Sequence, residues 1–387
     1  MWNFVSPRIV FGEGALDVLD ELHGKLALVV TDTNMVRIGS VDKVKAHLAK
    51  AGINVHVFDR VESDPSVQTT LRGAEIARDV QPDWIVGLGG GSPIDAAKAI
   101  WVLYERPDIE PAAIGPFGEL GLRKKARLIT IPTTSGTGAE ATWAIVLTDT
   151  NEKRKMGLGN MENVADIAIV DPEMAAGMPP RLTADTGLDA LAHGVEGYTC
   201  SWHTDLTDGL CIQATRLVFK YLVRAVSDGH DSEARERMHN AATCGGLGFG
   251  NAMASMAHAM GHCLGSAFHF PHGRAVSLFL PYTIEFSAPQ APERFAELAV
   301  YAGFPNDGGE KGARDFAQHI RDLCRQVGNP TSISEAGIGR KDFEGQLDKM
   351  VNDAFNDTQM VTAVRAPSVE EARQIFLYAY EGRPVDF

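Results

Sequence analysis

Histidines are concentrated in one short stretch of this sequence. Of the chain's 12 histidines, four fall within MASMAHAMGHCLGSAFHFPHG: His258, His262, His269 and His272. His258 and His262 are four residues apart in a helical pattern, so their side chains share one helix face. His272 follows a proline and precedes a glycine, which predicts a loop after that helix. Such histidines can bind a metal, relay a proton, or simply pack in a core.

A second pair with the same spacing lies earlier, in DTGLDALAHGVEGYT. Asp189 and His193 are four residues apart in an apolar helical pattern, so they also share a helix face. Two helices and a loop can therefore present Asp189, His193, His258 and His272 to one cation. One carboxylate and three imidazoles suit Fe²⁺, Zn²⁺, Mn²⁺, Co²⁺ or Ni²⁺ without choosing among them. A surface hydrogen bond within the Asp–His pair and packing of the histidines remain alternatives.

A glycine-rich segment in the first half, VGLGGGSPIDAAKA, predicts an anion site. It is expected to join a strand to a helix, where Gly90, Gly91 and Ser92 can bind phosphate through backbone N–H groups and a hydroxyl. Asp95 falls in the first turn of the expected helix. The segment does not match the dinucleotide fingerprint GxGxxG. A tight turn that binds nothing is the alternative.

Two further strand ends carry polar residues that suit a nucleotide. In IPTTSGTGAEAT, the hydroxyl groups of Thr133, Thr134 and Thr137 stand among small residues. Loops at the carboxyl ends of neighbouring parallel strands are where an α/β sheet binds its ligand. Asp32, in VVTDTN, can accept a hydrogen bond from a ribose 2′-hydroxyl and would repel a 2′-phosphate, which favours NAD over NADP. A helix cap is the alternative role for Asp32.

The elements that must position these residues alternate in the first half of the chain. Strands are expected at 26–34, 53–61, 83–91 and 127–134, and helices at 41–52, 69–80 and 92–104. This order predicts a largely parallel, Rossmann-like sheet with helices on both faces. After Met178-Pro179-Pro180 the pattern becomes helical. We therefore expect an α/β dinucleotide-binding domain at 1–179 and an all-α metal-binding domain at 180–387.

The composition excludes several classes of protein. The 387 residues carry a formal net charge of −14, so a nucleic-acid partner is not expected. Five cysteines without CxxC spacing argue against a disulfide framework. The N-terminus lacks the pattern of a signal peptide, and no stretch is apolar for the ~18 residues that a membrane span needs. A cytoplasmic protein is expected.

Four separated motifs together resemble one known family, the iron-containing alcohol dehydrogenases. They are GGGSPIDAAKAI, IPTTSGTGAEAT, DTGLDALAHGVEGY and MAHAMGHCLGSAFHFPHG. The resemblance runs in order from about residue 2 to 285, and less distinctively to the C-terminus. The N-terminal segment and WVLYERPDIE are most similar to the alcohol-dehydrogenase half of bifunctional aldehyde–alcohol dehydrogenases. The resemblance implies an active site in a cleft between the two domains.

The family's site residues fall on matching positions of this chain. The resemblance implies metal ligands at Asp189, His193, His258 and His272, and places His262 beside substrate and nicotinamide. It implies cofactor contacts at Gly90, Gly91, Ser92, Thr133, Thr134, Thr137 and Lys155. Ala144 stands where some relatives carry a cofactor-contacting Asn. His269 matches no ligand and is assigned to the cleft wall or to packing.

The implied activity is a metal-dependent alcohol dehydrogenase that uses NAD(H), with Fe²⁺ favoured and Zn²⁺ as the other candidate. Hydride leaves readily from an alkoxide, which a divalent cation stabilises, and His262 can pass the hydroxyl proton onward. An apolar pocket for a primary alcohol can come from Trp143, Phe249, Met256 and Phe268. A homodimer or larger homo-oligomer is expected. The alternatives are a glycerol-dehydrogenase-like enzyme, a dehydroquinate-synthase-like lyase, or a non-catalytic filament-forming relative.

Overall fold

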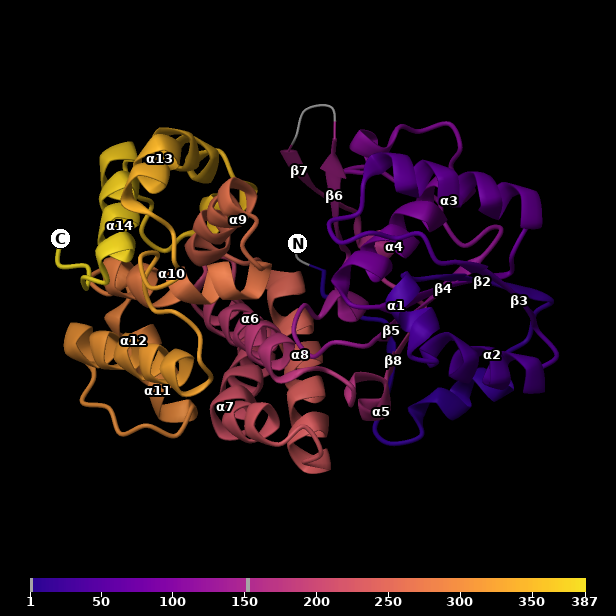
Figure 1. The fold of residues 1–387 in the computed structure, drawn as a ribbon, viewed down its shortest axis with the longest axis horizontal. Helices are drawn as coiled ribbons and strands as arrows, with labels where there is room; N and C mark the ends of the chain where they lie inside the picture. Colours follow the sequence, from indigo (N-terminus) through magenta and orange to yellow (C-terminus); the bar gives the residue numbers. More distant parts are fainter. Residues whose placement is uncertain (1–2, 151–153) are drawn as a thin grey trace. The chain divides into compact units, whose positions relative to one another are not determined.

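The computed structural model describes residues 3–150 and 154–387. The chain forms two compact units, Met1–Gly177 and Met178–Phe387. The first unit contains a sheet covered by helices, and the second is built from helices (Figure 1).

The first unit is organised around a six-stranded parallel sheet, with strand order β1-β8-β5-β4-β2-β3. Its strands are β1 (Arg8–Phe11), β2 (Leu26–Val30), β3 (Asn54–Phe58), β4 (Trp84–Gly89), β5 (Arg127–Pro132) and β8 (Ile167–Val170). The four strands expected from the sequence are present. β1 and β8 were not expected, because four-residue strands carry too little pattern to recognise.

Helices cover both faces of this sheet, as expected (Figure 1). On one face, α3 (Val67–Val80) and α4 (Gly91–Glu105) pack on alternate strand residues such as Leu28 and Ile85. On the other face, α2 (Ser40–Lys50) packs on the intervening residues. Burial on both faces explains why the central strands read as continuous apolar runs. The remaining short helices of this unit are α1 (Thr33–Arg37) and α5 (Pro172–Ala175).

An antiparallel hairpin leaves the sheet after β5. It pairs β6 (Ala144–Asp149) with β7 (Arg154–Gly159). β6 packs against α4, so the hairpin stands beside the helix that begins at the glycine loop. Lys155 therefore comes from a two-stranded element that the sequence reading did not anticipate.

The second unit contains helices and no strand among the residues that the structure describes, which confirms the predicted fold class of an α/β domain followed by a helical one. Its helices are α6 (Pro180–Thr199), α7 (Asp205–Ser227), α8 (Ser232–Ala252), α9 (Met256–Phe268), α10 (His272–Ser287), α11 (Pro292–Tyr301), α12 (Gly309–Gln326), α13 (Arg340–Phe355) and α14 (Val369–Glu381). Among the described helices of both units, none is long and apolar enough to cross a membrane.

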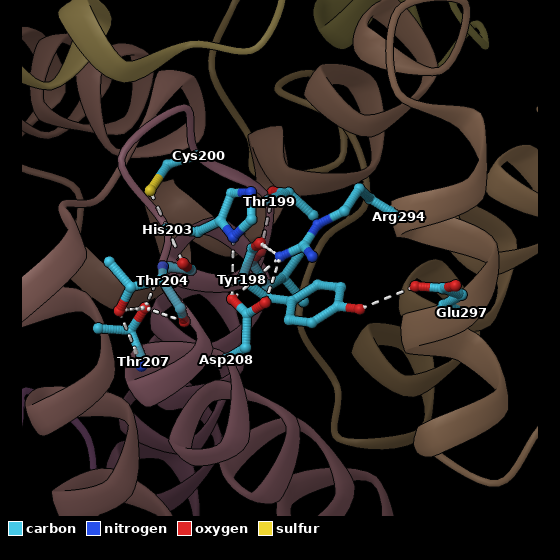
Figure 2. Close-up of polar contacts among 11 residues, drawn as sticks. Tyr198, Thr199, Cys200, His203, Thr204, Thr207, Asp208, Arg294 and Glu297 are labelled. Atoms are coloured by element: carbon cyan, nitrogen blue, oxygen red, sulfur yellow. Dashed lines mark hydrogen bonds and ion pairs between the residues drawn. The ribbon is translucent and has the colours of Figure 1, made fainter.

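The carboxyl end of α6 is fixed by a polar network (Figure 2). The Arg294 guanidinium donates to both carboxylate oxygens of Asp208 at 3.0 Å and to the carbonyl of Tyr198, and it lies 3.7 Å from the Tyr198 ring centroid. The Tyr198 hydroxyl donates to Glu297 at 3.1 Å. The network thus joins α6 to α7 and α11, and it holds the helix that carries Asp189.

Candidate functional site

Three of the expected metal ligands meet inside the second unit. Asp189 comes from the middle of α6, His258 from the first turn of α9, and His272 from the start of α10. His272 Nε2 lies 3.4 Å from Asp189 Oδ1, and His258 Nε2 lies 3.9 Å from the same oxygen. The three ligand atoms all lie within 4.8 Å of one another. Neighbouring donors about 3 to 3.5 Å apart are what a single ion at ~2.1 Å from each would need.

His272 reaches this cluster because α10 begins directly against α6. It is the first residue of α10, so the prediction that His272 lies in a loop is wrong by one residue. A Cβ on the next residue, Gly273, would lie 2.2 Å from the Asp185 carbonyl oxygen, so only glycine permits this approach. Arg274 then forms two hydrogen bonds, of 2.9 and 2.6 Å, with the Asp185 carboxylate. Glycine and ion pair together set the position of His272.

The electrostatics of the cluster fit a cation. Asp189 Oδ1 and His258 Nε2 are buried and have no hydrogen-bond partner among the described residues. Burial raises the pKa of Asp189 to about 7, against the opposing effect of His258 and with the help of the Glu196 and Asp185 charges. A buried carboxylate with an unsatisfied oxygen is costly unless a positive charge compensates it. The donor set of one carboxylate and two imidazoles matches a divalent transition metal.

His193, the fourth expected ligand, lies beside this group but is not one of the three whose donor atoms meet. Its ring is stacked on Phe249, with centroids 4.0 Å apart, and faces His258 at 4.8 Å. The structure therefore places one of the four aromatic or apolar side chains expected at the substrate pocket, Phe249, next to the cluster. Met256 is buried at the start of α9, and Phe268 is partly buried at its end. Trp143 belongs to the other unit.

Two carboxylates that the sequence reading missed bind histidines on α9. Glu196 accepts from the backbone N–H of Ala257 at 2.6 Å and contacts His258 Nδ1. Helical spacing in the sequence could have indicated Glu196, because it follows Asp189 by seven residues and so lies on the same face of α6. Asp357 Oδ2 lies 2.8 Å from His262 Nδ1. Nothing in the local sequence marks Asp357.

His262 lies in the middle of α9 and His269 is the residue after its last turn, and the two side chains have different environments. The His262 ring is stacked on His272 at 5.3 Å and meets His258 edge-on at 6.0 Å. His269 is exposed and forms the C-cap of α9 in a left-handed conformation, with φ 51°. His262 thus belongs to the cluster, and His269 ends a helix.

In the first unit, the two expected nucleotide loops touch each other. Gly90 is the N-cap of α4 and Gly91 its first residue. A Cβ at Gly90 would lie 3.3 Å from Thr134 Cγ2, and one at Gly91 would lie 3.1 Å from Thr137 Cγ2. The backbone N–H of Thr133 donates to the Gly89 carbonyl at 2.9 Å. The loops after β4 and β5 therefore form one polar surface at the N-terminus of α4, where an anion is favoured.

The polar side chains near these loops are largely bound within the unit. Ser92 Oγ accepts from the Asp64 backbone N–H at 3.3 Å, and Lys155 Nζ pairs with the Asp64 carboxylate at 2.7 Å. The structure thus brings Ser92 and Lys155 to the same residue. Thr137 Oγ1 accepts from the Ala139 N–H at 3.3 Å.

Two expected cofactor-binding carboxylates have structural partners. Asp95 Oδ2 accepts from the Val146 N–H at 3.0 Å, and desolvation raises the pKa of Asp95 to about 6 against the charge of Lys98. Lys98 is completely buried and donates to the Ala144 carbonyl at 2.9 Å. Asp32 Oδ1 caps α1 through two backbone N–H groups, whereas its Oδ2 accepts no hydrogen bond from the described residues. The contacts of Asp32 are therefore compatible with both of its expected roles, the helix cap and the contact with a ribose hydroxyl.

Family models match both halves of the chain. Residues 6–172 match the iron-containing alcohol dehydrogenase model, and residues 183–380 match the C-terminal model of the Fe-containing alcohol dehydrogenase family. The two models together cover nearly the whole chain.

Individual proteins agree with these matches. The NADPH-dependent butanol dehydrogenase of Clostridium saccharobutylicum is 40% identical over 100% of both chains. The bifunctional aldehyde-alcohol dehydrogenase AdhE of Escherichia coli K12 is 37% identical over 99% of this chain, which spans 46% of that protein. The crystal structure of a 1,3-propanediol oxidoreductase superposes with a TM-score of 0.92 at 33% identity, covering 98% of this chain and 100% of the other.

Proposed function

Because the chain belongs to the iron-containing alcohol dehydrogenase family, whose members are metal-dependent oxidoreductases that use a nicotinamide dinucleotide, we propose that it interconverts a primary alcohol and its aldehyde by NAD(H)-linked hydride transfer. The observation that carries the proposal is the cluster of Asp189, His258 and His272, with its two buried atoms that lack hydrogen bonds among the described residues. We assign the metal to the second unit and the dinucleotide to the first.

We propose Asp189, His193, His258 and His272 as the metal ligands. The three that already meet need no large change, and His193 is adjacent through its stacking on His258. Iron is the ion that the family name favours, and the same donors suit zinc. Such a cation would supply a positive charge that polarises the alcohol or aldehyde oxygen.

His262 is proposed as the residue that moves the hydroxyl proton. Its Nδ1 faces Asp357, while its Nε2 makes no hydrogen bond to any described residue, so that nitrogen is free to exchange a proton with substrate or water. The ring is partly exposed, at 27%, which gives the proton a route to solvent. Positioned proton transfer of this kind contributes typically ~10²–10⁴-fold to a rate.

We propose that the glycine loop and the adjoining threonine loop bind the pyrophosphate of the dinucleotide. Gly90, Gly91 and Ser92 offer N–H groups at the start of α4, and Thr134 lies against them. NAD(H) is favoured over the phosphorylated form because the unpartnered Asp32 Oδ2 would repel a 2′-phosphate. The NADPH dependence of the Clostridium relative makes this preference worth measuring directly.

A short to medium aliphatic primary alcohol is the proposed substrate, because the relatives named above are a butanol dehydrogenase and a 1,3-propanediol oxidoreductase. Phe249, packed beside the ligand group, supplies apolar surface for such a chain. We further propose a homo-oligomer in the cytoplasm, where its five free cysteines would stay reduced.

The proposal is tested by purifying the protein anaerobically, measuring its metal content, and following NADH or NADPH oxidation with aldehydes of increasing chain length and with benzaldehyde. About one iron or zinc per chain and rapid NADH consumption with a linear aldehyde are expected. Stoichiometric metal without hydride transfer to any aldehyde would contradict the proposal and favour the lyase branch of the superfamily.

A further inference from the structure

Helix α9 carries two histidines one turn apart, and each meets a carboxylate from another element through the same ring atom. His258 Nδ1 contacts Glu196 of α6, and His262 Nδ1 contacts Asp357 at 2.8 Å. Asp357 lies 95 residues further along the chain, between α13 and the 3₁₀ turn at Thr358–Thr362. In both histidines, Nδ1 therefore points toward a carboxylate.

The two oxygens of Asp357 have separate partners. Oδ1 accepts from the Gln359 backbone N–H at 2.8 Å and so caps the 3₁₀ turn, while Oδ2 faces His262. Burial alone would raise the pKa of Asp357, but the hydrogen bond from His262 helps to hold this pKa below its usual value. An ionised carboxylate only accepts hydrogen bonds, so the proton on a neutral His262 must sit on Nδ1.

We infer that Asp357 is a positioning residue that fixes the tautomer of His262 and thereby leaves Nε2 as the proton-accepting atom. The inference rests on the proposed function only in the role given to His262; the tautomer itself follows from the contacts of Asp357. The Nε2 atom makes no hydrogen bond within the described part of the chain, and the ring is held in place by stacking on His272. A carboxylate behind a histidine therefore sets both its orientation and its reactive nitrogen.

Because the two carboxylate oxygens of Asp357 have different partners, substitutions of Asp357 can separate their roles. In Asp357→Asn, the amide oxygen can keep the cap on Gln359, which turns the NH₂ group toward His262. A donor in that position favours the opposite tautomer, with the proton on Nε2. Asp357→Ser can also cap the turn but places no polar group within reach of His262, so the ring is free to take either tautomer.

We therefore expect kcat to fall about 10²–10⁴-fold in Asp357→Asn and by less in Asp357→Ser, with metal content and the KM for aldehyde near wild type in both. A merely structural role predicts the reverse order, because Asn is the closer match in shape. Asp353→Asn is the control. It removes a surface carboxylate of α13 that pairs with Lys349, and it should keep the wild-type kcat.

A second readout does not depend on activity. Nitrogen-15 spectra of the zinc-loaded protein with labelled histidine, assigned with His262→Gln, report which ring nitrogen carries the proton. Protonated Nδ1 in the wild type and protonated Nε2 in Asp357→Asn would support the inference. Protonated Nε2 in the wild type, equal kcat in Asp357→Asn and the wild type, or loss of metal in Asp357→Asn would overturn it. A wild type that oxidises no NADH would defeat the proposed function, and the spectra would still decide the tautomer.

Discussion

The histidine cluster of the second unit and the strand-end loops of the first unit differ in whether their polar side chains already have hydrogen-bond partners. In the cluster, Asp189 Oδ1 and His258 Nε2 are buried without a hydrogen bond from any described residue. Near the loops, Asp95 and Lys155 are already bound within the unit, and one oxygen of Asp32 caps a helix. A cation would thus be held by side chains, whereas a phosphate would be held by backbone that glycine leaves accessible.

This difference predicts how each region responds to substitution. Removing a ligand side chain should abolish the site in the second unit, because the proposed ion would lose one of its donor atoms. In the first unit, adding a Cβ should do more harm to cofactor binding than removing a hydroxyl or carboxylate.

His272→Ala should have the largest effect. The side chain is 36% exposed, so the substitution leaves the helical core intact while removing one of the three meeting ligands. We expect loss of bound metal and a fall in kcat of about 10³-fold or more, since polarisation by a metal is worth several kcal/mol. Metal analysis and NADH oxidation measure both. His269→Ala, at the exposed end of α9, is the control; a full metal complement in His272→Ala would refute the ligand assignment.

Glu196→Gln should weaken metal binding without abolishing it. Glu196 orients His258 through its Nδ1 and is itself fixed by the Ala257 N–H. Loss of a carboxylate behind a ligating histidine typically lowers metal affinity ~10–100-fold. Competition with a chelator measures this affinity. Glu297→Gln removes a carboxylate from the network at the end of the same helix and should leave the affinity unchanged. Equal affinities in both variants would mean that Glu196 serves only the fold.

Gly91→Ala tests the loop pair. The new Cβ would stand 3.1 Å from Thr137 Cγ2, so the Thr137 side chain must move by a few tenths of an ångström. We expect the KM for NADH to rise about tenfold, equivalent to ~1.4 kcal/mol, with metal content unchanged. Gly157→Ala, whose Cβ would meet nothing within 4 Å, is the matched control in the neighbouring hairpin. An unaltered KM in Gly91→Ala would place the cofactor elsewhere.

Asp32→Ser should have the smallest effect, a change in cofactor preference. Serine can still cap α1, but it removes the carboxylate that is proposed to repel a 2′-phosphate. The ratio of kcat/KM for NADPH to that for NADH should rise several-fold, by about 1 kcal/mol or less. Asp32→Ala also loses the cap, so comparing it with Asp32→Ser separates the effect of helix stability from the effect of the lost charge. If the ratio stays the same, Asp32 is only a helix cap.

Much of this arrangement could be predicted from the sequence where the signal is local. The spacing of four residues placed Asp189 with His193, and His258 with His262, on common helix faces. Alternation of apolar runs with helical patterns gave four of the six sheet strands. These features depend on periodicity, which a single segment displays by itself.

The rest depends on contacts between distant segments. Asp357 contacts His262 only because α13 ends beside α9, and no local sequence pattern predicts that packing. Gly273 looks like an ordinary loop glycine, although it decides how closely α10 can approach α6. The stacking of His193 on Phe249, beside the three meeting donor atoms, is likewise a result of tertiary packing.

Metal dependence is tested most directly by titrating metal-free wild-type protein with Fe²⁺ or Zn²⁺ under anaerobic conditions while measuring aldehyde-dependent NADH oxidation. Activity is expected to rise in proportion to bound metal and to saturate at about one ion per chain, and His272→Ala is expected neither to bind the ion nor to gain activity from it. Full activity in the metal-free protein, or activity restored in His272→Ala to the wild-type level, would contradict it.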